Sequence, residues 1–397
     1  MKDAGHALRP IGAFVSDVGM WSPNDDTPDD ERSYIDIASI DREVKKIAAC
    51  MRITPQNAPS RARQVVRQGD VLVSTVRPNL NAVAMVPQDL DGQIASTGFC
   101  VLRSDGTNLC NRYLFHWVQS PPFIAAMTRQ ATGASYPAVS DRIVKCSPLP
   151  LPPLAEQKRI ADILDKADDV RRKRRESHRV AKRLPLIIFS EMFMQTIKDE
   201  DATRTLGSLA DIASGVTKGR RFNGAETHVV PYLRVANVQA GFLDLGEIKT
   251  IEALPAEIQS LALQRGDVVM TEGGDLDKLG RGALWEHDIP NCIHQNHIFR
   301  VRPDREILLP VFFVTYLQTA RAKGYFLQCA KKTTNLATIN MRQLKALPVP
   351  IPSMGEQLRF ETRVHTFRTL ADRQSAGESA ANKLCESLAD RAFHGEL

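Results

Sequence analysis

Two short polar loops in the second half of the chain are built from residue types that contact nucleic acids. The loop GRRFNG contains Arg220, Arg221 and Asn223, and the loop AKKTTN contains Lys331 and Lys332. Arg and Lys side chains commonly contact phosphate oxygens, whereas Arg, Asn and Thr side chains also hydrogen-bond base edges. Ordinary surface turns use the same residues, so each loop taken alone allows both interpretations.

A group of histidines and one cysteine raises the question of a metal site. His287, Cys292, His294 and His297 lie close together in the sequence, and both residue types are zinc ligands. Their spacing matches none of the usual structural zinc patterns. We therefore interpret the group as coincidental and predict no metal site in this chain.

The composition is that of an ordinary soluble globular protein. Of the 397 residues, 43% are hydrophobic and 25% are charged, and this length allows two or three domains with separate cores. The 52 Lys and Arg residues exceed the 46 Asp and Glu residues, and the net charge of +6 is compatible with a polyanionic partner. The seven cysteines have no CxxC spacing, and no signal peptide or membrane-spanning run is evident. We expect a cytoplasmic protein with reduced cysteines and no membrane partner.

The chain contains an internal repeat, which indicates how the loops are positioned. Subtracting 200 brings Arg342 onto Arg142, and the prolines of PVPIP onto those of PLPLP. The same register brings the following Glu-Gln pair onto its counterpart and, near the C-terminus, Phe393 onto Phe193. Upstream, SYIDIASID resembles PYLRVANVQ, and QGDVLVSTVR resembles RGDVVMTEGG. Each copy therefore reads as a globular domain, a proline-rich hinge and a helix.

Each globular part is predicted to mix strands and helices. Short runs such as DVLVSTV, AVAMVP, DVVMT and HIFRVR alternate with turn residues and predict strands, whereas 111–130 and 310–329 are predicted helical. The alternating prolines favour an extended, polyproline-like spacer that leaves the domain. Pro153 suits the first turn of the next helix, and Ser353 with Glu356 forms an S-x-x-E capping box in the second copy.

The two helices carry apolar stripes that predict packing against each other. Phe360, Val364, Phe367 and Ala371 form one stripe, and a similar stripe in the first copy consists of Ile160, Ile163, Ala167 and Val170. Pro185 is expected to break or kink the first helix.

Two further motifs have competing interpretations. QSPPF, from Gln119, resembles an adenine methyltransferase loop, but the second copy reads QTARA there and no FxGxG cofactor loop precedes it. We therefore interpret QSPPF as a proline-initiated helix start. The run RRKRR, from Arg171 to Arg175, suits phosphate contact and an ordinary solvated helix face equally well.

Four stretches of the sequence together resemble a known family. PLPPLAEQKRIADILDKADD, the weaker IPSMGEQLRF, LGSLADIASGVTKG and the C-terminal FHGEL are similar to the specificity subunit of type I restriction-modification systems. The resemblance covers essentially the whole chain. It implies an α+β fold in which two mixed α/β target recognition domains are joined by two long antiparallel helices, with an internal pseudo-twofold repeat. The first domain departs from the pattern, because an acidic tract replaces its SGVTKG-like opening.

With the repeat, the resemblance implies a division into four segments. Residues 1–147 form the first target recognition domain, and 148–200 form a hinge and the central connector helix. Residues 201–347 form the second domain, and 348–397 form the second hinge and the C-terminal connector helix.

The candidate DNA-contacting residues are taken from the loops of both domains. They are Ser74, Arg77, Asn79, Ser135, Tyr136, Lys218, Arg220, Arg221, Asn223, Lys278, Lys331, Lys332, Thr333, Thr334 and Asn335. A second set marks the connector and the docking of partner subunits. It consists of Glu156, Gln157, Arg159, Glu356, Gln357 and Arg359.

The resemblance implies a non-catalytic subunit that recognises double-stranded DNA. Each domain would recognise one half of a bipartite target, while the helices set the spacer and dock modification (methyltransferase) and restriction/translocase subunits. No cofactor is expected in this chain; S-adenosylmethionine, ATP and Mg²⁺ would belong to the partners. The alternatives are the recognition subunit of a related type II methylase-nuclease system and a stand-alone adenine methyltransferase.

Overall fold

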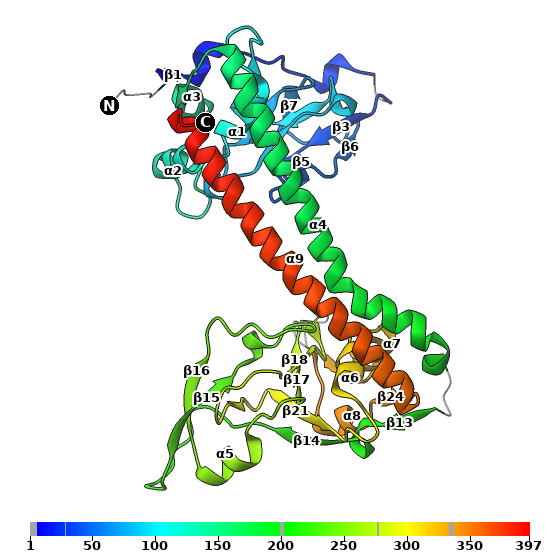
Figure 1. Ribbon diagram of the computed structural model, residues 1–397. Helices are drawn as coiled ribbons and strands as arrows, with labels where there is room; N and C mark the ends of the chain where they lie inside the picture. The colour runs from blue at the N-terminus through cyan, green and yellow to red at the C-terminus, as the bar shows by residue number, and fades with distance from the viewer. Residues whose placement is uncertain (1–5, 28, 199–201, 276–277, 333–336) are drawn as a thin grey trace. The chain divides into compact units, whose positions relative to one another are not determined.

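In its computed structural model, the chain divides into two compact units (Figure 1). The structure describes residues 6–27, 29–198, 202–275, 278–332 and 337–397. Unit 1 comprises Met1–Glu176 and Ser375–Leu397, and unit 2 comprises Ser177–Gln374. Each unit therefore contains one globular part together with a piece of each long helix.

Unit 1 contains two four-stranded sheets, with strand orders β2–β11–β8–β9 and β6–β3–β10–β7. Its strands are β1 (Leu8–Pro10), β2 (Val15–Ser16), β3 (Arg32–Ile35), β4 (Ile40–Asp41), β5 (Lys46–Ile47), β6 (Met51–Ile53), β7 (Ala62–Val65), β8 (Val71–Ser74), β9 (Val83–Met85), β10 (Ile94–Ser96), β11 (Phe99–Ser104) and β12 (Pro148–Pro150). Its short helices are α1 (Asn111–Trp117), α2 (Pro121–Gln130) and α3 (Asp141–Cys146).

Unit 2 contains a four-stranded sheet ordered β14–β21–β17–β19 and three-stranded sheets ordered β16–β15–β20 and β18–β23–β22. Its strands are β13 (Thr203–Thr205), β14 (Ala210–Ser214), β15 (His228–Leu233), β16 (Lys249–Ala253), β17 (Val268–Thr271), β18 (Gly273–Gly274), β19 (Gly282–Leu284), β20 (Ile293–His294), β21 (Ile298–Pro303), β22 (Lys331–Lys332), β23 (Ala337–Thr338) and β24 (Pro348–Pro350). Its short helices are α5 (Pro255–Leu261), α6 (Pro310–Tyr316), α7 (Ala320–Cys329) and α8 (Met341–Lys345).

The two units correspond strand by strand. The order β2–β11–β8–β9 matches β14–β21–β17–β19. In each unit one strand pair is parallel and includes the repeated tyrosine: β3, with Tyr34, pairs with β10, and β15, with Tyr232, pairs with β20. The expected strands DVLVSTV, AVAMVP, DVVMT and HIFRVR are confirmed as β8, β9, β17 and β21. The helices predicted over 111–130 and 310–329 are each divided in two.

The proline segments differ from the expected free spacer. Pro148–Pro150 pairs antiparallel with β1, and Pro348–Pro350 pairs with β13 in the same way. The residue between the prolines, Leu149 or Val349, is fully buried. Proline is tolerated here because each pair is an isolated two-stranded ribbon, where a missing N–H need not interrupt a wider ladder. Each hinge is therefore fixed to its own globular part.

Two long helices follow the proline segments (Figure 1): α4 (Leu154–Lys198) and α9 (Met354–His394). Ser353 donates both its backbone N–H and its hydroxyl to the Glu356 carboxylate, which confirms the glutamate half of the predicted capping box. The Glu356 N–H donates to the Ser353 carbonyl rather than to its hydroxyl. Pro153 lies just before α4 rather than inside its first turn, and its carbonyl accepts the Glu156 and Gln157 amides. Pro185 does not break α4, which continues through it as one helix.

The expected helix stripe is buried only at its start in the second copy, where Phe367 and Ala371 are half-buried, and is shifted in the first. Phe360 and Val364 are buried in the core of unit 2. In α4, Ile160 and Ala167 are buried, but Val170 is 48% exposed. Leu164 takes part in the buried face instead, so the stripe follows the core rather than a strict 4-3-4 seam.

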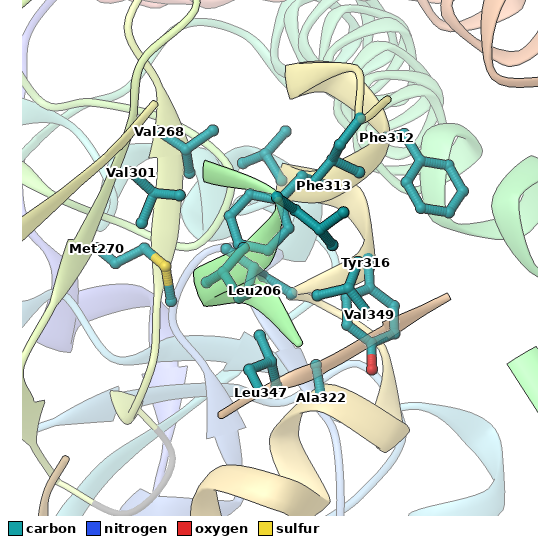
Figure 2. Packing of buried hydrophobic residues seen from close by; sticks show 14 of the residues in the cluster. Leu206, Val268, Met270, Val301, Phe312, Phe313, Tyr316, Ala322, Leu347 and Val349 are labelled. Carbon is teal, nitrogen blue, oxygen red and sulfur yellow. The ribbon is translucent and has the colours of Figure 1, made fainter. Parts of the chain in front are cut away.

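The core of unit 2 joins the long helices to the globular part (Figure 2). Phe312 lies on the side of α6 away from Val268 and Val301 of the sheet. Its ring centroid is 4.9 Å from that of Phe189 in α4, and Phe189 lies 5.4 Å from Phe360 in α9. In unit 1, Phe393 of α9 packs edge-on against Trp117 of α1, with centroids 5.0 Å apart. Such aromatic contacts bury large areas and favour these geometries.

Candidate nucleic-acid interface

A buried glutamine fixes each long helix to its globular part. Gln157 Oε1 accepts the Cys110 N–H at 2.8 Å, while its Nε2 donates to the carbonyls of Asn108 and Pro152, each at 2.9 Å. Gln357 repeats this with the Leu309 N–H and the Ile307 and Pro352 carbonyls. Both side chains are fully buried. The interpretation of these two glutamines as docking residues is therefore corrected, because a partner subunit cannot reach them.

The charged neighbours of the glutamines are accessible. Arg159 pairs with Glu156 and donates to the Leu397 carbonyl at 2.7 Å, yet 48% of its side chain is exposed. The Arg159 hydrogen bonds hold the pKa of Glu156 below its usual value. Glu356 caps its own helix, and Arg359 is exposed. These charges stay candidates for contact with a partner.

A buried aspartate forms an ion pair with an arginine at equivalent places of the two units. Asp70, which follows a glycine in QGDVLV, receives two hydrogen bonds from Arg103, at 3.0 and 2.7 Å. Asp267 receives two from Arg302, at 2.7 and 2.8 Å. The aspartates are almost completely buried, so removing either partner would leave an unpaired buried charge. Sequence analysis noticed the two Gly-Asp pairs but missed their arginines.

Four predicted DNA-contacting residues of unit 1 lie on two adjoining exposed loops. Arg77 and Asn79 follow β8, and Ser135 and Tyr136 precede α3; all four are exposed. The Arg77 guanidinium lies over the Tyr136 ring, 4.6 Å from its centroid. Ser74 is a correction: it is only 3% exposed and donates to the Val76 carbonyl at 2.9 Å, so DNA cannot reach its hydroxyl.

The corresponding loops of unit 2 contain different residues. The bridge between Val76 and Ala138 in unit 1 corresponds to the pairing of Gly273 with Thr338 in unit 2. Lys331 is exposed and pairs through its backbone with Thr338, next to this position. Lys278 forms an ion pair with Asp275. Lys332 lies at the end of β22, and the predicted contacts Thr333, Thr334 and Asn335 lie outside the described residues.

The two arginines of the GRRFNG loop have different surroundings, one paired with a carboxylate and the other exposed. Arg220 forms a bidentate pair with Glu257 of α5, and its guanidinium lies 5.3 Å from the Phe222 ring centroid. This pairing holds the pKa of Glu257 below its usual value. Arg220 therefore anchors the loop, whereas Lys218, Arg221 and Asn223 are exposed and free to face a ligand.

One exposed pair was missed by sequence analysis. His297 Nδ1 lies 2.7 Å from a carboxylate oxygen of Glu272, which directly precedes Gly273. The Glu272 backbone N–H also donates to the His297 carbonyl. In unit 1 the equivalent backbone hydrogen bond runs from the Thr75 N–H to the Gly98 carbonyl. A histidine and a carboxylate thus occupy a place where unit 1 has threonine and glycine, a substitution visible only after the two folds are matched.

The remaining motifs have structural explanations. Pro121 and Pro122 open α2, which confirms QSPPF as a helix start. Cys292 and His294 are fully buried, and His294 contacts the Ile298 carbonyl. In the part of the chain that the structure describes, no group of three or more His, Cys, Asp or Glu side chains is arranged to hold a metal ion. Within those same residues, no helix is long and apolar enough to span a bilayer.

The basic run in α4 is partly neutralised. Arg171 pairs with Asp168 and Arg172 with Asp169, each at 2.7 Å, and Arg175 lies 3.5 Å from Glu378 of α9. These pairs favour the solvated helix face over a strong phosphate-binding patch, because their charges are already compensated.

Comparisons with known proteins agree on one family. The family model for the type I restriction modification DNA specificity domain matches residues 34–177. One solved chain, from work on complex assembly and conformational transition of the type I R-M system, aligns over 99% of this chain and 98% of its own, with 27% identity and a TM-score of 0.64. By these matches, this chain is similar to the specificity subunits of type I restriction-modification systems.

Individual relatives are consistent with this assignment. The EcoKI specificity subunit of Escherichia coli K12 is 23% identical over 78% of this chain and 70% of its own length. The StySPI subunit of Salmonella potsdam is 21% identical over the same shares of the two chains. The S subunit from M. genitalium, 13% identical with a TM-score of 0.53, shares the fold. The specificity subunit is a non-catalytic DNA-recognition protein, and neither the type II alternative nor a stand-alone methyltransferase is favoured.

The lysines of β22 provide a test of phosphate contact in this chain. Replacing both Lys331 and Lys332 by alanine is expected to weaken DNA binding and to reduce the slope of log K against log salt by about one unit per lost contact. Binding titrations at several salt concentrations measure this slope. The matched control, Lys249→Ala with Lys323→Ala, removes equal charge from exposed positions of the same unit. An equal change in both double variants would assign β22 to an ordinary basic surface.

Proposed function

We propose that each unit of this specificity subunit binds one half of a bipartite double-stranded DNA target. The two long helices would connect the halves at a fixed separation and dock methyltransferase and restriction/translocase subunits. S-adenosylmethionine, ATP and Mg²⁺ would bind those partners. The contribution of this chain is positioning, since it places a partner's active site at a chosen sequence.

One observation carries this proposal: the same scaffold is used twice with different exposed side chains. The segment after β8 bears Arg77 in unit 1, and the segment after β17 bears Gly274 in unit 2. The facing segment bears Tyr136 in unit 1 and Lys331 in unit 2. Base edges are distinguished by the donors and acceptors that face them. Two equivalent surfaces with unlike donors are suited to recognise two unlike sequences.

The exposed charges of the long helices support the docking part of the proposal. Arg159 and Arg359 occupy matching positions one turn into their helices, and both are exposed. The buried glutamines beside them hold the backbone that presents these arginines. A partner could therefore recognise the same pattern at both helix starts.

Domain exchange tests the modular part of the proposal. Replacing residues 201–345 by the corresponding segment of a relative leaves the whole of α4, β24 and α9 in place, so docking should persist. We expect the hybrid, purified with its methyltransferase subunit, to modify sites in which only one half has changed. Mapping methylated adenines in treated DNA would measure this. A change in both halves would contradict independent recognition by the two units.

A further inference from the structure

The exposed turn after β8 holds an arginine against an aromatic ring. The Arg77 guanidinium carbon lies 4.6 Å from the centroid of the Tyr136 ring, and Tyr136 is itself 69% exposed. An arginine stacked in this way is attracted by the ring's negative face. Arg77 and Tyr136 are therefore stacked on the surface before any ligand binds. Neither side chain is part of the hydrophobic core.

The stacking covers one face of the guanidinium and leaves its edge available. One N–H, from Nη2, reaches the Ser135 carbonyl at 3.3 Å. Within the described part of the chain, no carboxylate lies within ion-pair distance of Arg77, whereas Arg220 is occupied by Glu257. The remaining donors form the planar fork that matches two neighbouring acceptors.

Backbone hydrogen bonds fix the position of the Arg77 segment and so of its guanidinium group. The Arg77 N–H donates to the Pro137 carbonyl at 2.7 Å, and the Val139 N–H donates to the Thr75 carbonyl at 2.9 Å. Arg77 itself adopts φ 49°, a left-handed conformation that disfavours residues other than glycine. The equivalent residue of unit 2 is Gly274, whose φ of 159° is close to the extended region, so the left-handed conformation belongs to unit 1 alone. An arginine in this conformation points to a use for its side chain.

We propose that Arg77 recognises a guanine in the half-target bound by unit 1, with Tyr136 as its positioning residue. A guanine presents O6 and N7 as adjacent acceptors in the major groove, and a bidentate arginine is their most frequent specific partner. Stacking on Tyr136 orients the fork before DNA arrives and so lowers the entropy cost of the contact. This inference rests on the proposed function, because it assumes that unit 1 faces a half-target.

The decisive experiment measures base preference. The full-length chain with its methyltransferase subunit is used to select duplexes from a randomised library, and bound DNA is sequenced. The wild type should prefer guanine at one position by about ten- to hundred-fold. Arg77→Gly should abolish that preference, and only that one, without backbone strain, because glycine accepts this conformation. Arg77→Lys should also abolish it, since lysine keeps the charge but lacks the fork.

Variants of Tyr136 separate positioning from a loss of folding. Tyr136→Phe keeps the ring and should keep the guanine preference, whereas Tyr136→Ala should weaken it and leave the other half of the target unchanged. Replacing the selected guanine by 7-deazaguanine removes N7. That change should weaken wild-type binding but not the binding of Arg77→Gly. Arg52→Ala, at an exposed position of β6, is the control and should leave all preferences intact.

The outcomes separate this inference from the proposed function. If the wild type selects a bipartite sequence and Arg77→Gly and Arg77→Lys select the same one, Arg77 does not recognise a base and only this inference fails. If Arg77→Lys keeps the preference that Arg77→Gly loses, the contact is to charge rather than to guanine, which also overturns it. If the wild type selects no sequence, the proposed function fails.

Discussion

Replacing Gln357 by leucine is expected to lower the free energy of unfolding of unit 2 by about 3–5 kcal/mol. The substitution leaves the buried Leu309 N–H and the Ile307 and Pro352 carbonyls without their partner. Each unsatisfied buried group costs about 1–3 kcal/mol. Leucine has a similar volume, so the loss reflects hydrogen bonding more than packing. Hydrogen exchange resolved by peptide would measure the opening of each unit separately.

The repeat offers a matched comparison for this effect. Gln157→Leu should destabilise unit 1 by a similar amount and leave the exchange of unit 2 amides unchanged, because its partners are Cys110, Asn108 and Pro152. Arg359→Ala, one turn from its helix start and exposed, should change stability by less than about 0.5 kcal/mol. If Gln357→Leu behaved like Arg359→Ala, the glutamine would not fix the helix, and a docking role would have to be considered again.

The internal repeat was sufficient to predict the architecture, because two similar sequences adopt the same backbone fold. Strands β8 and β17, the matched helix starts and the capping by Glu356 all follow from local pattern and register. What it did not reveal was the direction of side chains. Gln157 follows a charged residue on a polar helix, so its sequence neighbours suggest an exposed side chain. It is buried because the loop before α1 packs over it.

The binding surface was less predictable for the same reason. Arg77 and Tyr136 are far apart in the sequence, and their stacking depends on the bridge between Val76 and Ala138. Arg220 and Arg221 are adjacent, yet a glutamate on α5 pairs with the first. Ser74 ends a strand and turns inward, as the alternation of side chains along a strand permits. Loop composition selected the candidate segments, while tertiary contacts decided which of their residues are exposed.

Lengthening both long helices by seven residues is expected to shift the preferred spacer of the DNA target. Helix α4 passes from unit 1 to unit 2 after Glu176, and α9 returns from unit 2 to unit 1 after Gln374, so insertions at these two points lie between the units. A helix rises 1.5 Å per residue, so seven residues add roughly 10 Å. At about 3.4 Å per base pair this equals roughly three additional pairs of spacer.

Rotation limits how well the lengthened protein can bind. Seven residues turn a helix by only about 20° from its former phase, which keeps the apolar faces of α4 and α9 nearly in register. Three base pairs turn the DNA by roughly 100°, so the second half-target would face a different direction. We therefore expect weaker binding together with a preference for the longer spacer. Selection from a library of spacer lengths would measure both.

A single insertion provides the control for the paired one. Seven residues added to α4 alone leave α9 at its original length, so the two helices can no longer pack in register at both ends. Binding to every spacer should then fall without a new preference. If instead the doubly lengthened protein kept the original spacer, the helices would not set the distance, and the separation of the half-targets would have to be fixed by the partner subunits.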